Sequence, residues 1–304
     1  MSRDLNPKLT PELDSEVFIS DSMRQKRTTA TLVRLSLIGI VALVIVAVLV
    51  LPVLAIFAAA LSKGVGPYFT GIFSNETWQA LTLTMVTVAI VVPLNTIFAL
   101  ALAWAVTKTK ARGSTWLLVL TDLPLTISPV VTGLMLILLY GQRSWLGSHL
   151  HQLGFDIVYS VPAVILATLF VTVPYVAKQI LPQLEAQNRQ VEEAALTLGA
   201  GGLAIFRRIT LPSIKLSLVQ GVILTAARAA GEFGAVSMVS GHIRGLTTTL
   251  PQHVEILYNE YRFTAAYAVA SILALFAILS LAVKAFFMNA AESSPSSNGT
   301  RGAI

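Results

Sequence analysis

Two oppositely charged residues, Arg228 and Glu232, lie inside a strongly apolar stretch of the sequence. Four residues apart on a helix, they share a face and can form an ion pair. An unpaired arginine at the centre of a bilayer costs about 2.5–3.5 kcal/mol, so an arginine there is expected to have a structural partner or a function. Two interpretations remain open: a structural ion pair inside a helical bundle, or a cation that an anion meets while it crosses the membrane.

A third charge, Asp122, precedes two prolines in another apolar stretch, Pro124 and Pro129. Prolines interrupt membrane helices and free backbone carbonyls, and the broken helices of transporters tend to line cavities. Asp122 is therefore a candidate for the same pathway. The sequence leaves open whether its side chain faces a pathway or packs at an interface.

The remaining residues give little support for covalent catalysis. The chain has no cysteine, no His-Glu-x-x-His and no Gly-x4-Gly-Lys-Ser/Thr. Disulfides and thiolate catalysis are thus excluded, and the zinc-protease motif and the phosphate-binding loop are missing. We expect no enzymatic activity, no cofactor and no metal site, and any ATP that drives the protein must be hydrolysed by a partner chain.

Membrane helices must position these charges, because 55% of the 304 residues are hydrophobic and only 12% are charged, with a mean hydropathy of +0.75. Each apolar stretch reaches the roughly 20 residues that a helix needs to cross the hydrocarbon. Long runs without period-two alternation exclude a β-barrel and predict an all-α protein. The six predicted transmembrane helices are the uncharged runs 35–62, 77–107, 123–142, 157–177 and 263–283 and a segment at about 214–240 that carries Arg228 and Glu232.

The basic residues predict the orientation of these spans. Of the 21 lysines and arginines, Arg228 lies within a span and 16 fall on one side if the N-terminus is cytoplasmic. The other side then holds only Lys63, Arg143, Arg244 and Arg262. Cytoplasmic loops carry the basic excess, so both termini are predicted to be cytoplasmic. The net charge of +6 then reflects topology and anionic lipid rather than a nucleic-acid partner.

The most patterned polar segment, residues 184–212, lies between the fourth and fifth predicted spans. Good helix formers come first, and Gly199, Gly201 and Gly202 then permit a turn. A short amphipathic helix follows, with Leu203, Phe206 and Ile209 on one side and Arg207 and Arg208 toward water. Pro212 is expected to open the fifth span. The residues alone predict a compact cytoplasmic projection. They leave open the alternative that this segment only connects two spans and binds no partner.

This segment resembles the E-A-A-x3-G-x9-I-x-L-P signature of binding-protein-dependent (type I) ABC importer permeases. In that family the segment is a coupling helix that sits in a groove of the ATPase subunit. The resemblance implies the same contact here, with small alanines that allow a close approach. Every fixed position of the signature matches, and the implied ATPase-coupling residues are Glu193, Ala194, Ala195, Gly199, Ile209, Leu211 and Pro212.

The resemblance extends over about residues 30–288. Residues 227–235 resemble the fifth-helix motif of oxyanion permeases, whereas 122–131 and 240–261 are similar to the W-type permeases of sulfate/thiosulfate importers. The implied fold is the type I permease fold in a bacterial inner membrane. It implies a six-helix permease at 31–288 with a core at about 77–283, flanked by disordered cytoplasmic segments at 1–30 and 289–304.

The implied function is the ATP-driven import of sulfate or thiosulfate. The implied partners are two copies of an ABC ATPase, a second permease of the T type, a periplasmic binding protein and membrane lipid. Arg228, Glu232 and Asp122 are then candidates for the translocation pathway. A docking platform for the binding protein is expected in the 241–262 loop, although its tyrosines also suit a membrane-interface belt; the docking candidates are Arg244, Glu255 and Glu260.

Two other transport functions remain open. A molybdate or tungstate permease would share the motif at 227–235, whereas the 241–261 stretch favours sulfate. A stand-alone secondary anion transporter would not need the segment at 193–212.

Overall fold

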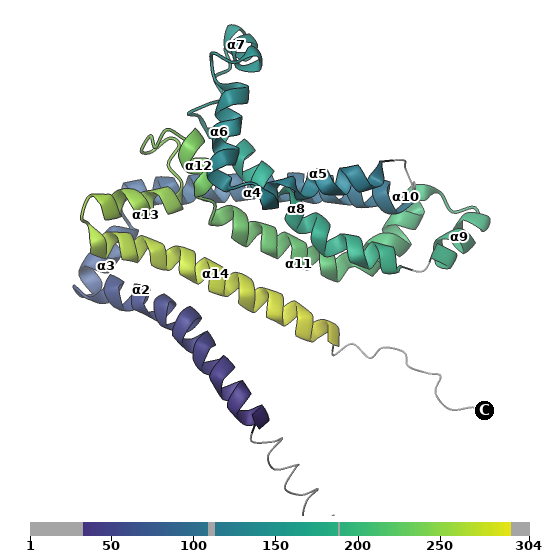
Figure 1. Cartoon of the computed structure of the whole chain (residues 1–304), viewed down its shortest axis with the longest axis horizontal. Coiled ribbons are helices and arrows are strands. Elements are labelled where there is room, and N and C mark those ends of the chain that lie inside the picture. Colours follow the sequence, from purple (N-terminus) through teal and green to yellow (C-terminus); the bar gives the residue numbers. More distant parts are fainter. Residues whose placement is uncertain (1–32, 109–112, 188, 293–304) are drawn as a thin grey trace, which may run out of the picture. The chain divides into compact units, whose positions relative to one another are not determined.

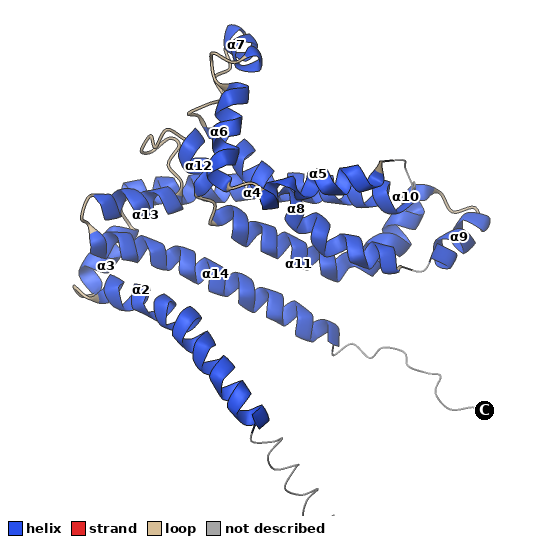
Figure 2. Cartoon of the chain, viewed as in Figure 1, coloured by secondary structure: helices blue, strands red, loops and turns tan. Residues whose placement is uncertain are grey.

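A computed structural model describes residues 33–108, 113–187 and 189–292, and every regular element in these ranges is a helix (Figures 1 and 2). The prediction of an all-α protein is therefore confirmed. The chain divides into two compact units, residues 1–56 and 57–304, which we describe separately. The predicted disordered segment 1–30 and residues 293–304 of the other lie outside the described residues, while 289–292 belong to the last helix.

The described part of the first unit belongs to the first span, Val33–Leu61. This span contains a π-helical turn, η1 (Val46–Val50), followed directly by α2 (Leu51–Leu61), whose last residues belong to the second unit. Pro52 is the second residue of α2. Proline lacks an N–H and its ring collides with the carbonyl four residues earlier, and the wider π turn gives that carbonyl more room.

Four long helices dominate the second unit: α4 (Asn75–Lys108), α8 (Val161–Ala186), α11 (Leu211–Ala230) and α14 (Phe263–Glu292). Small side chains let α4, α8 and α11 approach closely, which is how membrane helices pack without a hydrophobic driving force. Their shared core consists of Ala99, Leu102, Ala103, Val176, Ala177, Ile180, Leu184 and Ile214.

Short helices occupy the two ends of this bundle (Figure 1). At one end, α13 (Leu250–Asn259) packs on α4 and α14, and α3 (Val65–Ile72) packs on α14. At the opposite end lie α9 (Arg189–Thr197) and α10 (Gly202–Ile205). We refer to residues 71–77 with 240–262 as the α13 end, and to residues 189–210 as the α9 end.

The third predicted span, 123–142, is not one straight helix. It divides into α5 (Ser114–Thr126) and α6 (Pro129–Tyr140), which meet at 110°, and α7 (Trp145–Gln152) follows. Ile127 and Ser128 are extended, and Ser128 is so because the residue before a proline avoids the helical region. Within the described residues, five helices are long and apolar enough to cross a membrane by themselves, and counting the bent pair as one span gives six.

The predicted boundaries of the fifth span, about 214 and 240, are both wrong. One continuous helix runs over Gly202–Ala230, through α10, the π turn η2 (Phe206–Thr210) and α11. Pro212 therefore lies inside this helix rather than at its start, and η2 precedes it as η1 precedes Pro52. At the far end the helix stops, and α12 (Gly234–Val239) is a separate short helix, so Arg228 occupies the last turn of α11.

Candidate functional site

A glycine turn closes α9 at the α9 end. The Gly199 N–H donates to the Leu196 carbonyl and the Ala200 N–H to the Ala195 carbonyl, both at 2.9 Å. This pair of bonds is a Schellman motif, whose first residue beyond the helix needs a left-handed conformation. Gly199 has φ +83°, as the predicted turn requires, whereas Gly201 has φ −70° and does not need to be glycine.

The α9 end carries an open face. Glu193, Ala194 and Gly199 are exposed, and Leu198 and Leu203 are 88% and 72% exposed. The exposure of Leu203 contradicts the predicted amphipathic helix: Leu203 lies in the open first turn of α10, whereas Phe206 and Ile209 further along the helix are half-buried. The predicted exposure of Arg207 and Arg208 is confirmed, and Phe206 packs edge-on against Trp104 of α4, with ring centroids 5.5 Å apart.

The motif residues divide between two places. Glu193, Ala194 and Gly199 belong to the open face and Ala195 is half-buried, whereas Ile209 and Leu211 lie half-buried inside the fifth span. Pro212 is exposed in the first turn of α11. The fifth span thus begins within the motif itself, so a partner at α9 would sit directly beside a membrane helix.

One residue of this region was missed by the sequence analysis. Glu192 is buried, and its Oε1 accepts a hydrogen bond from the Thr210 hydroxyl at 2.9 Å. Thr210 is itself completely buried at the end of η2. The signature marks Glu193 and leaves its neighbour unmarked, so no signal in the sequence distinguished Glu192.

The ion pair predicted from the four-residue spacing is present. Arg228 Nη1 lies 2.8 Å from Glu232 Oε2, and the Glu232 side chain is 1% exposed while that of Arg228 is 31% exposed. The other carboxylate oxygen, Oε1, accepts a hydrogen bond from the Ala235 N–H at 3.0 Å. Glu232 therefore both neutralises Arg228 and satisfies a free N–H in the first turn of α12.

The two interrupted spans meet beside this ion pair. A Cβ on Gly133 of α6 would lie 2.6 Å from Met238 Cβ and 2.7 Å from the Ala235 carbonyl oxygen. Only glycine allows α6 and α12 to approach this closely. A Cβ on Gly234 would likewise lie 2.9 Å from Pro129 Cβ, so the break between α5 and α6 contacts the break between α11 and α12. Arg228 occupies the last turn of α11, just before the second break.

Asp122 has a partner that the sequence analysis did not identify. Its Oδ2 lies 3.1 Å from the Nζ of Lys178, and both side chains are about half exposed. Lys178 directly follows the predicted span 157–177, but in the structure it lies inside α8. The structure therefore joins α5 and α8 through an ion pair separate from the pair of Arg228.

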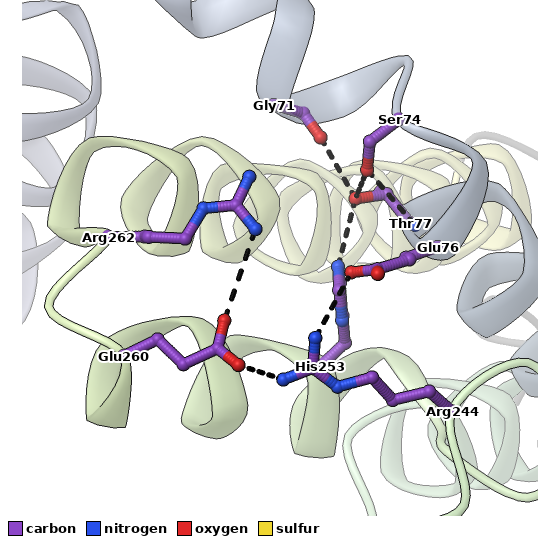
Figure 3. A network of polar contacts seen from close by, with 8 residues as sticks. All are labelled: Gly71, Ser74, Glu76, Thr77, Arg244, His253, Glu260 and Arg262. Atoms are coloured by element: carbon purple, nitrogen blue, oxygen red, sulfur yellow. Dashed lines mark hydrogen bonds and ion pairs between the residues drawn. The ribbon is translucent and has the colours of Figure 1, made fainter.

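The α13 end contains a connected network of charged side chains (Figure 3). Arg244 forms a short hydrogen bond with Glu260 and lies 3.6 Å from Glu76, while Arg262 lies 3.9 Å from Glu260. Bonding to Glu260 raises the pKa of Arg244. The third docking candidate, Glu255, pairs instead with His242 at 3.5 Å. Glu76 lies in the first turn of α4, far along the chain from Arg244, so spacing within one helix could not identify it.

A buried histidine lies next to this network (Figure 3). The His253 side chain is buried, and its Nε2 lies 3.1 Å from the hydroxyl of Thr77. That hydroxyl donates to the Gly71 carbonyl at 2.9 Å and accepts from the Ser74 hydroxyl at 2.8 Å, so the ring N–H of His253 is the donor. Burial lowers the pKa of His253 and favours this neutral form.

Comparisons with known proteins agree with this geometry. The family described as "Binding-protein-dependent transport system inner membrane component" matches residues 95–290. The chain is 47% identical to the "Sulfate transport system permease protein CysW" of Synechocystis sp., over 76% of this chain and 84% of that protein. It is 32% identical to the "Sulfate transport system permease protein CysT" of Salmonella typhimurium, over 68% and 74%.

A solved structure supports the fold. The crystal structure of a bacterial alginate ABC transporter, in complex with an alginate-bound periplasmic protein, superposes with a TM-score of 0.69. It covers 89% of this chain and 98% of the matched chain at 16% identity, which establishes a common fold. The chain therefore belongs to the binding-protein-dependent transport system inner membrane components and is a multi-pass membrane protein with the type I ABC permease fold.

Proposed function

We propose that this chain is the W-type permease subunit of an ATP-driven importer that moves sulfate across the bacterial inner membrane. The observation that carries this proposal is the chain's much higher identity to a protein named as a W-type sulfate permease than to one named as T-type. The molybdate alternative has no comparable support. A stand-alone transporter would not explain the exposed motif of the α9 end.

The proposed topology places both termini and the α9 end in the cytoplasm, and the α13 end outside. It follows from the excess of basic residues on one side. The permease comprises residues 31–288, with its type I core at about 77–283. Two copies of an ATPase subunit hydrolyse ATP, and a T-type permease supplies the other half of the pathway.

The ATPase contacts the open face of α9 at Glu193, Ala194, Ala195 and Gly199. The remaining motif residues, Ile209, Leu211 and Pro212, carry the resulting displacement into the fifth span. Closure of the ATPase pair on ATP then favours an outward-open arrangement, and nucleotide release favours the inward-open one. Each ligand must bind one arrangement better than the other for this cycle to run.

Arg228 is the proposed cation of the pathway, with Glu232 as the carboxylate that holds it in place. Its partly exposed guanidinium keeps further N–H donors that suit a tetrahedral oxyanion. Arg228→Ala should abolish sulfate transport while the permease still assembles with its ATPase. Loss of assembly in this variant would instead assign the ion pair a structural role.

Glu232→Gln supplies a matched variant. The amide oxygen can still accept from the Ala235 N–H, so only the charge is lost.

Asp122, paired with Lys178, belongs to the same pathway in this proposal, and Asp122→Asn should lower transport less than Arg228→Ala.

The α13 end is the proposed platform for the periplasmic binding protein. Arg244, Glu255 and Glu260 are about 40% exposed there and carry both signs of charge. Charge reversal at Glu255 and Glu260 together should weaken docking of the binding protein, measured by pull-down on the purified importer. Unchanged docking would remove these residues from the platform.

Uptake of labelled sulfate by cells, or by liposomes holding the complete importer, tests the proposed function. Unlabelled thiosulfate and molybdate serve as competitors. We expect accumulation that depends on ATP and on the binding protein, with strong competition by thiosulfate and weak competition by molybdate. Accumulation of molybdate without sulfate would contradict the proposal.

A further inference from the structure

A buried carboxylate, Glu192, ties α9 to the fifth span. The hydroxyl of Thr210 donates to its Oε1 at 2.9 Å, across 18 residues of sequence. Glu192 is 8% exposed and Thr210 is fully buried. Hydrogen bonds to a charged oxygen are stronger than neutral ones, and solvent competes little for this one. The contact is therefore a firm mechanical link between two segments.

Thr210 lies at a point from which a displacement reaches the membrane bundle. It is the last residue of η2, and Ile214, one turn later on the same helix, is fully buried in the core shared with α4 and α8. The Ser213 hydroxyl also bonds to the Thr210 carbonyl at 2.7 Å. A force on the Thr210 side chain therefore acts on the face of the helix that packs into the bundle.

The helix around Thr210 is also the part of the fifth span best able to bend. Pro212 has no N–H for the Arg208 carbonyl, and η2 replaces the regular α-helical bonding there. Such π turns are common causes of helix kinks and often lie at functional positions. On the other side of the turn, Phe206 is held by Trp104 of α4. The Glu192–Thr210 bond therefore joins the helix between Phe206 and Ile214, which are both packed against other helices.

The opposite face of α9 remains available to a partner. Glu193 follows Glu192 directly and is exposed, as is Ala194. An ATPase subunit on that face would move α9 without competing for the Glu192 contact. We propose that the Glu192–Thr210 hydrogen bond is the joint that transmits movement of α9 to the fifth span, with Glu192 and Thr210 as positioning residues. This inference rests on the proposed function of the chain as an importer subunit.

A purely structural role would predict a different result. If the bond only held α9 in place, its loss would weaken ATPase binding and lower transport and ATP hydrolysis together. If the bond transmits movement, its loss leaves a complete importer that hydrolyses ATP without moving its substrate. The number of substrate molecules moved per ATP hydrolysed separates the two roles.

The test uses the complete importer, with its own partner permease, ATPase and binding protein, in liposomes containing labelled sulfate. Thr210→Val removes the hydroxyl at nearly constant volume, and we expect the transport-to-hydrolysis ratio to fall about tenfold, as loss of a hydrogen bond to a charged group implies. Thr210→Ser keeps the hydroxyl and should retain the wild-type ratio. Glu192→Gln keeps an acceptor without the charge and should give an intermediate ratio.

Thr168→Val is the matched control. Thr168 is equally buried, but its hydroxyl bonds to the Val164 carbonyl of its own helix at 2.8 Å. This variant should leave the ratio unchanged. The double variant Glu192→Ala with Thr210→Val should be no worse than Glu192→Ala, because that change already removes the contact that Thr210→Val removes.

The proposal is overturned if Thr210→Val couples transport to hydrolysis as the wild type does. It is also overturned if Thr210→Val and Glu192→Gln release the ATPase from the purified complex, since the bond would then serve assembly. Failure of the proposed function is recognised separately in the wild type: an importer that moves another anion still allows the ratio to be measured with that anion. A wild-type chain that binds no ATPase would refute both.

Discussion

The two ends of the helical bundle are held together in different ways. At the α13 end, Thr77 and His253 form a buried centre, and Arg244 and Glu260 add ion pairs near the surface. At the α9 end, one glycine turn and the buried bond between Glu192 and Thr210 organise a face with exposed apolar side chains. Among the described contacts, polar and charged side chains form a connected network at the α13 end, whereas at the α9 end a buried bond joins a glycine-closed helix to the fifth span.

This difference fits the roles proposed for the two ends. A surface that receives a binding protein can be rigid, because rigid surfaces lose less entropy when a partner docks. A segment that relays movement must instead be ordered within itself and joined to its neighbour at few points. The following predictions test whether stability is concentrated at the α13 end, from the largest expected effect to the smallest.

Thr77→Val should destabilise the α13 end most. The substitution removes a buried hydroxyl that bonds to Gly71, Ser74 and His253, and leaving such partners unsatisfied costs about 1–3 kcal/mol. The measurement is thermal unfolding of the purified protein in detergent. Thr82→Val on the same helix is the control, because its exposed hydroxyl bonds only to the Trp78 carbonyl. Equal melting temperatures for the two variants would contradict this prediction.

Gly199→Ala tests the order within the α9 end. Alanine at φ +83° costs about 1–2 kcal/mol, which should open the turn and reduce the amount of ATPase that co-purifies by several-fold. Gly201→Ala is the matched control, since its φ is −70° and a Cβ there would meet no atom within 4 Å. The overall melting temperature should change little in either variant. Similar ATPase recovery from both would show that the turn is not required.

Acidification should loosen the α13 end through His253. Burial, the largest influence, lowers the pKa of this histidine in the folded protein; Glu76 and Glu260 oppose that shift, and Arg244 and Arg262 act in the same direction as burial. The resulting stability is present above the ordinary histidine pKa of about 6.5 and is lost as pH falls below it.

His253→Gln should therefore show a smaller drop in melting temperature between pH 7.5 and pH 5.5 than the wild type, a pH range chosen to span the ordinary pKa of about 6.5. His149→Gln, which changes an exposed histidine, should retain the full drop. If both variants behave like the wild type, His253 does not control the acid response.

Local patterns in the sequence predicted the features that depend on neighbouring residues. Long apolar runs located the spans, the four-residue spacing predicted the pair of Arg228 and Glu232, and Gly199 marked a turn. The signature located the motif, but the position of its last residues inside a helix followed from the π turn before Pro212. Propensity rules place proline at a helix start and do not anticipate that a π turn can accommodate it.

Contacts between distant segments could not be predicted in the same way. Thr77 and His253 are separated by 176 positions, and neither Asp122 with Lys178 nor Glu192 with Thr210 follows a helical spacing. Such pairs depend on how helices pack against each other, which periodicity within one helix does not contain. The residues most important for our inference therefore became visible only in the folded chain.

Glu260→Gln is expected to have the smallest effect on stability, and it best separates the surface charges of the α13 end from its buried contacts. Its carboxylate is the central acceptor of the surface network (Figure 3), since it is bonded to Arg244 and lies close to Arg262. These contacts alone would suggest a large contribution to stability. All three side chains are nonetheless about 40% exposed or more, and exposed ion pairs contribute about 0–1 kcal/mol because water competes for them. We expect a small drop in melting temperature that disappears in about 1 M salt, where screening is nearly complete. A drop as large as that of Thr77→Val, or one insensitive to salt, would place the stability of the α13 end in its charges. The contrast with the α9 end would then be one of surface electrostatics rather than of buried contacts.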